Sequence, residues 1–459
     1  MEPSDYLEGH DSSGERPPSH TITVPRTPAV VPAITPVQTS AALPDSTTVA
    51  VIGGGIVGLT AALNLAERGI PVVVLEKGRI AGEQSSRNLG WIRKMARAKF
   101  DVPMSLASDR LWAQMPARVG TDVGYRQAGI LYLARTEAEM AMHRDWLDSV
   151  RDLSLDSRLL TPAEIDALVP GGTGTWAGGI HTPSDGRAEP QFAASAIART
   201  VIAKGGVIVE NCAVRTLSMA AGRVSGVITE RGEVRCDQVL LAGGVWSRRF
   251  LGNLGVQLLT LPIAATVART APLEGPTEIA VGGPDFSFRK RHDGGYTITQ
   301  RGAMPTPLTL DHLLIGTRYI PMLRAQWANV RLSLGKTFID DLALPRRWGP
   351  TARSPFERVR TLDPLPNNAL NAEALHNLTQ AWPIFKRTVL KETWGGMIDV
   401  TPDSLPVISP VKMIPGLTLA SGFSGHGFGT SPAAGQLAAD LITHQAPIVD
   451  PTPYRLERF

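Results

Sequence analysis

The feature that most constrains this chain is a glycine-rich GxGxxG turn at residues 53–58, which separates two different apolar patterns. Residues 48–52 form a short apolar run, typical of a buried strand. Residues 59–68 place apolar side chains at the i, i+3, i+4 and i+7 spacing of a buried helix face. A second apolar run follows at residues 71–75. This order of strand, turn, helix and strand predicts a βαβ unit that begins a parallel sheet.

Each glycine of the turn has its own role in a dinucleotide site. Gly53 permits the tight turn, Gly55 lets the backbone approach a pyrophosphate, and Gly58 lets the helix pack on the strand. The phosphates would then lie at the helix N-terminus, where free N–H groups and the dipole favour negative charge. Glu76 ends the second strand, where an acid can bind a ribose hydroxyl and disfavour NADP. The pattern predicts dinucleotide binding over a turn without a ligand, and it does not distinguish FAD from NAD.

The composition suits a large globular protein and argues against several other classes. Of the 459 residues 43% are hydrophobic, which is enough for two or three domains. The net charge is only +4 and no block of Lys or Arg occurs, so charge gives no case for nucleic-acid binding. Cys212 and Cys236 form no CxxC pair and no HExxH motif occurs. We therefore expect neither a disulfide scaffold nor a metal site.

The rest of the chain changes in character along its length. Residues 1–45 are rich in Pro, Ser and Thr, and we expect a disordered leader there. The later patterns are short strands over 207–240, a hairpin over 286–301, helical stretches over 323–332 and 372–382, a glycine-rich turn over 422–429 and a helix from about Pro432 to Ile442. Because strands and helices alternate irregularly, we expect an α/β cofactor domain interleaved with an α+β domain.

Five separated segments resemble the D-amino-acid-oxidase superfamily of FAD-dependent oxidoreductases, which includes glycine oxidase, sarcosine oxidase and the L-amino acid deaminases. They are the GGGIVG turn and residues 83–88, 185–190, 239–247 and 422–429. Within the superfamily the chain is most similar to the bacterial L-amino acid deaminases. Five stretches of this sequence follow their pattern: NLAERG, LEKGRIAGEQSSR, NCAVRTL, LAGGVWSRRFLGNLG and the terminal IVDPTPYRLERF. The resemblance extends from about Thr47 to Phe459.

The resemblance implies a particular division of the fold. An FAD-binding Rossmann-like domain of the glutathione-reductase type would comprise residues 46–130, 185–255 and 386–459. An α+β substrate-binding domain would comprise residues 131–184 and 256–385, with a helical insertion at about 305–380 that is similar to one in the deaminases.

The resemblance also implies which residues bind FAD. The 53–58 turn and Glu76 would hold the ADP half, Ser85 and Ser86 would line the pyrophosphate, and Val214 would hold adenine through its backbone. The full expected set is Gly53, Gly55, Ile56, Val57, Gly58, Glu76, Lys77, Gln84, Ser85, Ser86, Val214, Ala242, Gly243, Trp246, Gly395, Gly396, Gly425, His426, Gly427, Phe428, Gly429 and Thr430. Glycines beside a flat ring are physically reasonable, because side chains there would collide with it.

Two departures from the sarcosine-oxidase branch bear on the chemistry. That branch attaches its flavin to a cysteine just before a TPD stretch, and the matching position here is Gly396. We therefore expect non-covalent FAD. The branch also has a lysine that promotes reaction with oxygen, and here Gly429 takes its place. Both O2 and a quinone of the respiratory chain stay open as the electron acceptor.

The substrate's carboxylate calls for an arginine, whose planar fork can donate two parallel hydrogen bonds. Arg301 aligns with the substrate-binding arginine of the deaminases, at the end of a predicted strand, and Arg93 falls near a carboxylate-binding arginine of the sarcosine-oxidase branch. Trp91, Trp394, His426 and Phe428 are candidate walls of the pocket. Three of them have a structural alternative: Trp91 and Trp394 as core residues, and His426 as a residue that only packs and forms hydrogen bonds within its turn.

The predicted reaction is oxidative deamination of an L-amino acid to a 2-oxo acid and ammonia, by hydride transfer from the α-carbon to the flavin. Positioning of the substrate's α-hydrogen against the flavin would supply much of the catalysis, so we expect no obligatory general base. Oxidation of a D-amino acid or a secondary amine, such as sarcosine, a proline derivative or an opine, is the alternative within the fold. A flavin-bound subunit of a larger dehydrogenase complex is the alternative of another class.

The sequence also bears on location. The N-terminus lacks a positive start followed by an apolar stretch, so we expect no secretory signal. The apolar window from Thr48 to Ala66 is better explained by the buried strand and helix than by a membrane span. We expect no transmembrane segment and a cytoplasmic enzyme, with peripheral membrane contact through the 305–380 insertion left open. A homo-oligomer is also left open.

Overall fold

The βαβ unit predicted from the glycine turn is present and lies at the centre of a six-stranded sheet. The computed structural model describes residues 31–459. The strand order is β20 (Val407–Pro410), β21 (Leu417–Ser421), β12 (Gln238–Leu241), β1 (Val49–Ile52), β2 (Val72–Leu75) and β8 (Val207–Val209). All neighbours are parallel except β20 and β21. The central strands are apolar throughout because both of their faces are covered.

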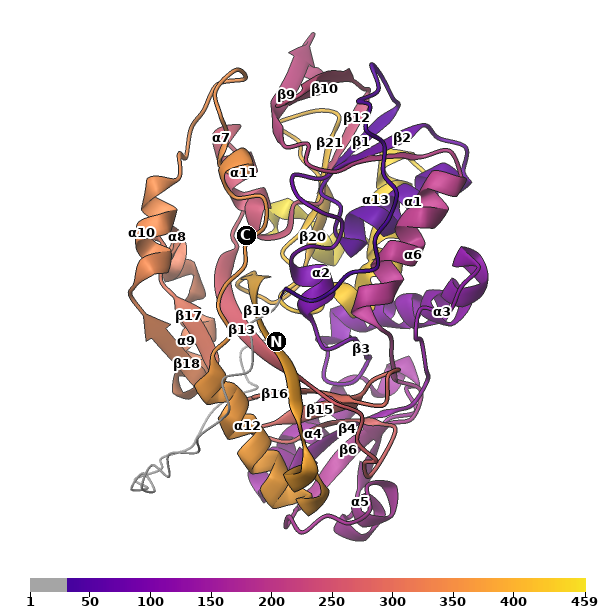
Figure 1. Ribbon diagram of the computed structural model, residues 1–459, viewed down its shortest axis with the longest axis vertical. Helices are drawn as coiled ribbons and strands as arrows, with labels where there is room; N and C mark the ends of the chain where they lie inside the picture. Colours follow the sequence, from indigo (N-terminus) through magenta and orange to yellow (C-terminus); the bar gives the residue numbers. More distant parts are fainter. Residues whose placement is uncertain (1–30) are drawn as a thin grey trace.

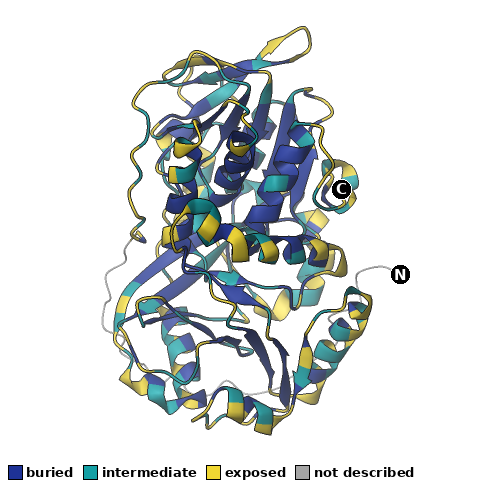
Figure 2. Cartoon of the chain, turned by 90° about the vertical axis from the view of Figure 1, so that its right-hand side faces the viewer, coloured by how far each residue is buried: buried dark blue, intermediate teal, exposed yellow. Residues whose placement is uncertain are grey.

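Helices cover one face of this sheet and a small antiparallel sheet covers the other (Figure 1). The helices are α1 (Ile56–Glu67), α3 (Val102–Val119), α6 (Pro190–Ala203) and α13 (Gly427–Ile442), which share one apolar core. The second core lies under β9 (Val214–Ala220), β10 (Arg223–Thr229), β11 (Gly232–Arg235) and α7 (Ser247–Asn253). Figure 2 shows that the strands and inner helix faces of this half are buried.

An eight-stranded sheet forms the other half of the molecule. Its order is β19 (Leu390–Val400), β13 (Leu261–Thr270), β16 (Tyr296–Thr299), β15 (Ser287–Lys290), β14 (Ala280–Gly282), β4 (Ile130–Ala134), β6 (Gly178–Thr182) and β5 (Arg158–Leu160). Only the β14–β4 pair is parallel. The helices α4 (Glu137–Ser149), α5 (Pro162–Leu168) and α12 (Asn368–Ala381) contact it. The predicted hairpin over 286–301 is confirmed by β15 and β16.

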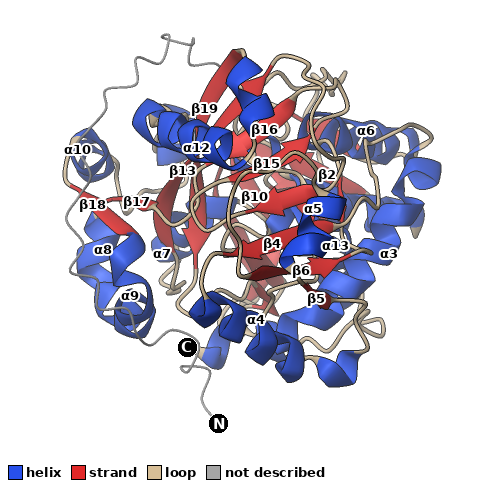
Figure 3. Ribbon diagram, turned by 90° about the horizontal axis from the view of Figure 1, so that it is seen from below, coloured by secondary structure: helices blue, strands red, loops and turns tan. Residues whose placement is uncertain are grey.

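Short elements join the two halves and form a separate group at one side. α2 (Gln84–Arg87) and the pair β3 (Trp91–Ile92) and β7 (Gly186–Arg187) lie between the two large sheets. The side group comprises β17 (Met304–Pro307), α8 (Leu310–Ile315), α9 (Ile320–Gln326), β18 (Val330–Ser333), α10 (Lys336–Ala343) and α11 (Pro355–Arg358). Figure 3 shows α8, α9, α10, β17 and β18 together at one edge, outside the central strands.

The expected helix over 323–332 is partly wrong. The α-helix ends at Gln326, a short 3-10 helix follows at Trp327–Asn329, and Val330–Ser333 form β18, which pairs in parallel with β17. Tertiary pairing of a β-branched and aliphatic stretch, VRLS, here outweighs its local helical pattern.

The expectation of a disordered leader is wrong for residues 31–45. The N–H of Ser40 donates to the carbonyl of Ile208 at 2.8 Å, and Ile34, Val37 and Leu43 pack against the two cores. The high proline content of this segment predicted disorder. The apolar side chains between the prolines bury enough surface against the two cores to hold the segment in place. Residues 1–30 of the predicted leader lie outside the described residues.

Two C-terminal boundaries also differ from expectation. Residues 386–400 were expected in the FAD-binding domain, but β19 pairs with β13 along its length and belongs to the eight-stranded sheet. The last helix begins at Gly427 rather than near Pro432. Pro432 lacks an N–H for the carbonyl of Phe428, and the Ser431 hydroxyl donates to that carbonyl at 2.8 Å instead, so the helix continues through the proline.

Candidate functional site

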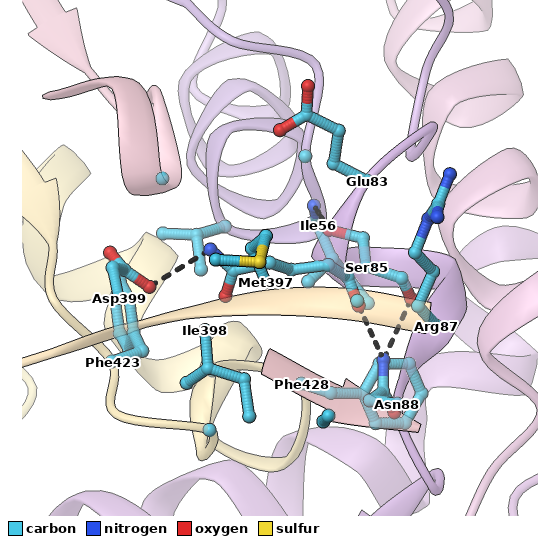
Figure 4. A pocket seen from close by; sticks show the side chains of 18 of the residues that line it. Ile56, Glu83, Ser85, Arg87, Asn88, Met397, Ile398, Asp399, Phe423 and Phe428 are labelled. Carbon is cyan, nitrogen blue, oxygen red and sulfur yellow. Dashed lines mark hydrogen bonds between the residues drawn. The ribbon is translucent and has the colours of Figure 1, made fainter. Parts of the chain in front are cut away.

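A cavity of about 600 Å³ is lined by residues from both large sheets. One end is formed by the glycine turn after β1, by the end of β2 and by Val214 of β9. The other end is formed by side chains from β4, β15 and the segment after β16. Figure 4 shows its middle, where Ser85 of α2, Asp399 of β19 and Phe428 of α13 face a common space.

The glycine turn brings backbone, rather than side chains, to the first end of the cavity. Gly53 has φ of +110°, and a Cβ there would lie 2.5 Å from the carbonyl oxygen of Ala242. A Cβ at Gly58 would lie 2.3 Å from the carbonyl oxygen of Gly53. The N–H of Ile56 opens α1 and donates to the Ser85 hydroxyl at 2.9 Å, and no acidic residue lies in the first turn of α1. This end therefore suits a phosphate group.

Glu76 lies beside that turn, as its position in the sequence predicts. Its two oxygens accept hydrogen bonds from the N–H groups of Gly54 and Gly78, each at 2.7 Å. A carboxylate has about four acceptor positions, so it retains capacity for a ribose hydroxyl. Burial raises the pKa of the Glu76 carboxyl, against the lowering effect of Lys77 and of these two hydrogen bonds.

Lys77 forms part of the cavity wall and its charge is already paired. Its Nζ donates to Glu83 at 2.6 Å and to the carbonyl of Arg360 at 2.9 Å, and it lies 4.7 Å from the centroid of the Trp246 ring. The Trp246 Nε1 also donates to Glu83, at 3.1 Å. Lys77 and Trp246 thus hold the wall in place, beside Val214.

Asp399 is a buried carboxylate in the middle of the cavity that the sequence did not single out. It accepts a hydrogen bond from the Gln84 amide at 3.0 Å, the dashed line at Asp399 in Figure 4. It also accepts one from the N–H of Gly422 at 2.7 Å. Burial raises the pKa of its carboxyl, and the hydrogen bond from Gln84 opposes that rise. These bonds connect α2, β19 and the turn before α13, so Asp399 fixes the three segments around the cavity.

The glycine-rich turn before α13 presents another stretch of bare backbone. Gly425 has φ of +81°, and a Cβ at Gly429 would lie 2.8 Å from the carbonyl oxygen of Trp91. His426, Gly427 and Phe428 line the cavity between them. A flat ring can approach this turn closely, and the N-terminus of α13 would favour negative charge on it.

At the opposite end, Arg301 lies over an aromatic ring. Its guanidinium carbon is 4.1 Å from the centroid of the Tyr132 ring. A Cβ at Gly282 would lie 2.0 Å from Arg301 Nη1, so the arginine occupies space that only a glycine leaves open. Arg301 forms no ion pair with any carboxylate of residues 31–459. The strand before it ends at Thr299, two residues earlier than expected.

Arg93 lies at the same end and contacts His426. Its Nη2 lies 3.0 Å from His426 Nε2, and its guanidinium carbon is 5.8 Å from the Tyr132 centroid. Burial, followed by the charges of Arg97 and Arg93, lowers the pKa of His426 well below its usual value. His426 is therefore neutral at pH 7 and accepts a hydrogen bond from Arg93 through Nε2, which places its own proton on Nδ1.

Three buried polar atoms that line the cavity have no hydrogen-bond partner within the described part of the chain. They are Trp91 Nε1, Ser287 Oγ and Gln300 Oε1. Buried polar groups are nearly always satisfied, because leaving one unpaired costs about 1–3 kcal/mol. Because all three residues line one cavity, a polar ligand bound there could supply their missing partners.

The structure brings most of the sequence-predicted residues to the cavity and leaves five away from it. Those that line it are Gly53, Gly55, Ile56, Val57, Glu76, Lys77, Gln84, Ser85, Trp91, Arg93, Val214, Ala242, Gly243, Trp246, Arg301, Gly396, Gly425, His426, Gly427, Phe428 and Gly429. Those that do not are Gly58, Ser86, Trp394, Gly395 and Thr430.

Trp394 is the one expected pocket wall that is wrong. It is buried under α2, and its Nε1 donates to the carbonyl of Arg87 at 3.0 Å. Gly395 packs against the carbonyl of Pro364, and Thr430 donates to the carbonyl of His426 within α13. Gly58 packs α1 on β1, which is the role that its place in the motif predicts, and Ser86 donates to Glu83.

Sequence reasoning missed Tyr132, Arg97, Ser287, Gln300 and Asp399, all of which line the cavity. Tyr132 lies in the uniformly buried run ILYLA, where no period separates a cavity side chain from a core one. Ser287 and Gln300 lie at the two ends of the predicted hairpin over 286–301, so their proximity to Arg301 was the available signal.

Comparison with known proteins agrees with this geometry. Residues 48–441 match the family model described as DAO, FAD dependent oxidoreductase. The structure of L-amino acid deaminase from Proteus myxofaciens in complex with anthranilate is similar with a TM-score of 0.89 and 31% identity, over 93% of this chain and 96% of that one. Sarcosine oxidase subunit beta from an Arthrobacter species is 27% identical, over 90% of each chain. Mitochondrial sarcosine dehydrogenase from Mus musculus is 22% identical over 93% of this chain, which spans only 43% of that protein. The chain belongs to the DAO family of FAD-dependent oxidoreductases.

Proposed function

We propose that this protein catalyses the FAD-dependent oxidative deamination of an L-amino acid to a 2-oxo acid and ammonia. The observation that carries the proposal is Arg301, an arginine without an acidic partner in residues 31–459, held at the end of the cavity opposite the phosphate-binding turn. The similarity to an L-amino acid deaminase, over almost the full length of both chains, supports the choice of substrate class.

The residues present fit FAD. The bare backbone at Gly53 and the N-terminus of α1 suit its pyrophosphate, and Glu76 suits its ribose. The Gly425–Gly429 turn leaves room for the flavin ring. Neither Cys212 nor Cys236 lines the cavity, and burial raises the pKa of both thiols, to about 12 for Cys236. These features support non-covalent FAD.

The proposed mechanism depends mainly on positioning. When bound, FAD supplies the acceptor for a hydride. Arg301 binds the substrate carboxylate and so orients the α-carbon, while Trp91, Tyr132 and Phe428 exclude water. The substrate reacts with its amine neutral: the C–H electron pair leaves as hydride, and the nitrogen lone pair forms the C=N bond. Water then hydrolyses the imine to the 2-oxo acid and ammonia. Neutral His426 is no proton donor at pH 7.

Oxidation of a D-amino acid or a secondary amine is the second candidate. It is favoured by the similarity to sarcosine oxidase subunit beta and sarcosine dehydrogenase, although at lower identity. Sarcosine oxidase subunit beta is, by its name, part of a larger assembly. A role as a subunit of a larger dehydrogenase complex is therefore one outcome that the test distinguishes.

Location and electron acceptor complete the proposal. No helix among residues 31–459 has the length and apolar character needed to cross a bilayer. The side group of helices exposes several large apolar residues, including Leu313, Trp327, Leu334 and Ile339. We propose a cytoplasmic enzyme with peripheral membrane contact through this group, and reoxidation by O2 or by a membrane quinone. Co-sedimentation with vesicles, and reoxidation of the reduced protein by air or a quinone, test these two points.

The decisive experiment is anaerobic reduction of the bound flavin, monitored through the loss of its visible absorbance. Single L-amino acids, the matching D-amino acids and sarcosine are the reductants. Reduction by L-amino acids alone supports the proposal, with the 2-oxo acid and ammonia as products. Reduction only by D-amino acids or sarcosine would replace it with the second candidate. A flavoprotein that none of them reduces would favour the complex-subunit alternative.

A further inference from the structure

Two unpaired arginines share one aromatic ring at the substrate end of the cavity. Arg301 and Arg93 both lie over Tyr132, at 4.1 and 5.8 Å from its centroid. Within the described residues neither forms an ion pair with a carboxylate. Arg97 and Arg360, which also line the cavity, are paired, with Asp101 at 3.2 Å and with Glu230 respectively. The substrate end therefore carries two positive charges more than its carboxylates neutralise.

The two arginines are held in place by contacts that leave donors free. No hydrogen bond from Arg301 to residues 31–459 is present, and Tyr132 and Gly282 define its position. Arg93 Nη1 donates to the carbonyls of Met95 and Ala96, at 2.5 and 3.1 Å, and its Nη2 donates to His426. An arginine has five N–H donors, so the Nε–H and one Nη2–H of Arg93 stay free. That edge can bind a carboxylate with two hydrogen bonds.

The carboxylate of Asp185 feels the charge of Arg93, but it already pairs with Lys94 at 3.4 Å and forms no ion pair with either arginine. His426 is neutral because burial, Arg97 and Arg93 disfavour its protonation. Burial, with the charge of Arg93 next in size, lowers the pKa of Arg97 to about 10, so Arg93 and Arg97 lie close enough to repel each other. The negative charge of FAD is on its pyrophosphate, which the α1 end of the cavity suits. A substrate with one carboxylate would leave one arginine without a carboxylate partner, whereas a second carboxylate would give it a charge-assisted pair of hydrogen bonds.

Resting on the function proposed above, we infer that the preferred substrate is an amino acid with a second carboxylate in its side chain, of the aspartate or glutamate class. Arg301 binds the α-carboxylate and Arg93 binds the side-chain carboxylate. Arg93 is thus the residue that selects the substrate, and the cation-rich end of the cavity selects against neutral side chains through the charge they leave unpaired.

The test compares each acid with its neutral isostere. The rate of anaerobic flavin reduction and the apparent Kd are measured for L-glutamate against L-glutamine and for L-aspartate against L-asparagine. The acids should be favoured by at least about tenfold in the ratio of rate to Kd, because a bidentate charged contact is lost in the amides. Arg93→Gln should remove that preference while Arg93→Lys retains part of it. Retained flavin absorbance confirms that each variant is folded.

Two further readouts separate substrate recognition from other roles of Arg93. The midpoint potential of the flavin should be the same in Arg93→Gln as in the wild type, because Arg93 acts on the substrate. A shifted potential with an unchanged preference for the acids would overturn the inference. Arg151→Gln is the matched control, because it removes the same charge from a residue that is 80% exposed and paired with Asp148, and it should keep the wild-type preference.

The outcomes distinguish this inference from the function on which it rests. If the amides or other neutral L-amino acids reduce the flavin as well as the acids do, the inference is wrong and the deaminase proposal stands. If D-glutamate or iminodiacetate reduces the flavin and no L-amino acid does, the deaminase proposal is wrong and the requirement for two carboxylates stands. If none of these compounds reduces it, both are wrong.

Discussion

The two ends of the cavity recognise their ligands by different means. The nucleotide end uses backbone N–H groups and bare glycines, and the charge of Lys77 in its wall is paired with Glu83. The substrate end uses side chains from distant segments, and its arginines lack acidic partners among residues 31–459. The glycine turn of the first end comes from one local stretch of sequence, to which Val214 and Ala242 are added by the fold, and the second end exists only once β4, β16 and β3 are brought together. Damage to each end should therefore have a different signature.

The largest effect should follow from closing the nucleotide end. Gly53→Ala places a Cβ 2.5 Å from the carbonyl of Ala242, in a backbone conformation that costs about 1–3 kcal/mol for a residue other than glycine. The turn would move and FAD binding would be lost. We expect bound flavin, measured by absorbance after purification, to fall to below about a tenth of the wild-type content.

The matched control for this variant is Gly252→Ala. Gly252 lies in α7, and a Cβ there meets nothing within 4 Å. Its flavin content should equal that of the wild type. If Gly53→Ala retained full flavin, the assignment of this turn to the pyrophosphate would have to be abandoned.

The next effect should come from the substrate end and leave the flavin in place. Arg301→Gln removes the guanidinium over Tyr132, and kcat/KM for the substrate should fall about 100-fold, the loss of about 2.7 kcal/mol of binding to the transition state. Bound flavin should stay at the wild-type level. Arg301→Lys should recover only part of the loss, because a lysine lacks the two-pronged geometry. Equal kcat/KM in the wild type and Arg301→Gln would contradict the carboxylate role.

The contrast between the ends also explains how much the sequence could predict. The βαβ unit, the glycine turn and Glu76 follow from local periodicity and the steric needs of a pyrophosphate, and the structure has them as predicted. Arg301 could be singled out only through resemblance to a family, since an arginine after a strand has no local signature. Tyr132 lay hidden in a run of five buried residues, because burial in a sheet and exposure to a cavity look alike in sequence.

The residues that follow β3 also show that the sequence alone does not separate a cavity side chain from a core one. Arg93, Lys94 and Arg97 lie within five residues, and all three are basic side chains. Lys94 is buried against Asp109 and Asp185, whereas Arg93 faces the cavity and pairs with no carboxylate in the described structure. Their different roles depend on which acids the fold places near each of them, and those acids come from α3 and the loop before β7. Spacing alone could not have separated them.

A smaller effect at the substrate end should come from a substitution of Gly282, which leaves the space that Arg301 occupies. Gly282→Ala would place a Cβ 2.0 Å from Arg301 Nη1 and push the guanidinium off Tyr132. Because the arginine is displaced rather than removed, we expect KM to rise about tenfold with kcat little changed. Gly316→Ala, where a Cβ meets nothing within 4 Å, is the control. A Gly282→Ala variant with wild-type KM would show that Arg301 does not depend on this stack.

The smallest effect should appear in stability rather than turnover, at His143 of α4. Burial, followed by the charge of Arg301, lowers the pKa of His143 to about 4, and its Nε2 has no partner among residues 31–459. Between pH 6.5 and 4 the unfolded chain binds a proton there that the folded protein lacks. The free energy of unfolding should therefore fall as the pH drops through this window, by up to about 1.4 kcal/mol per pH unit from this group.

Urea unfolding at pH 7 and pH 5 measures this loss of unfolding free energy. The loss should be smaller in His143→Gln than in the wild type. His376→Gln, at an exposed position of α12, should keep the wild-type loss. The same loss in all three proteins would mean that His143 does not titrate differently on folding, and that the positive charge of Arg301 is not felt beyond the cavity.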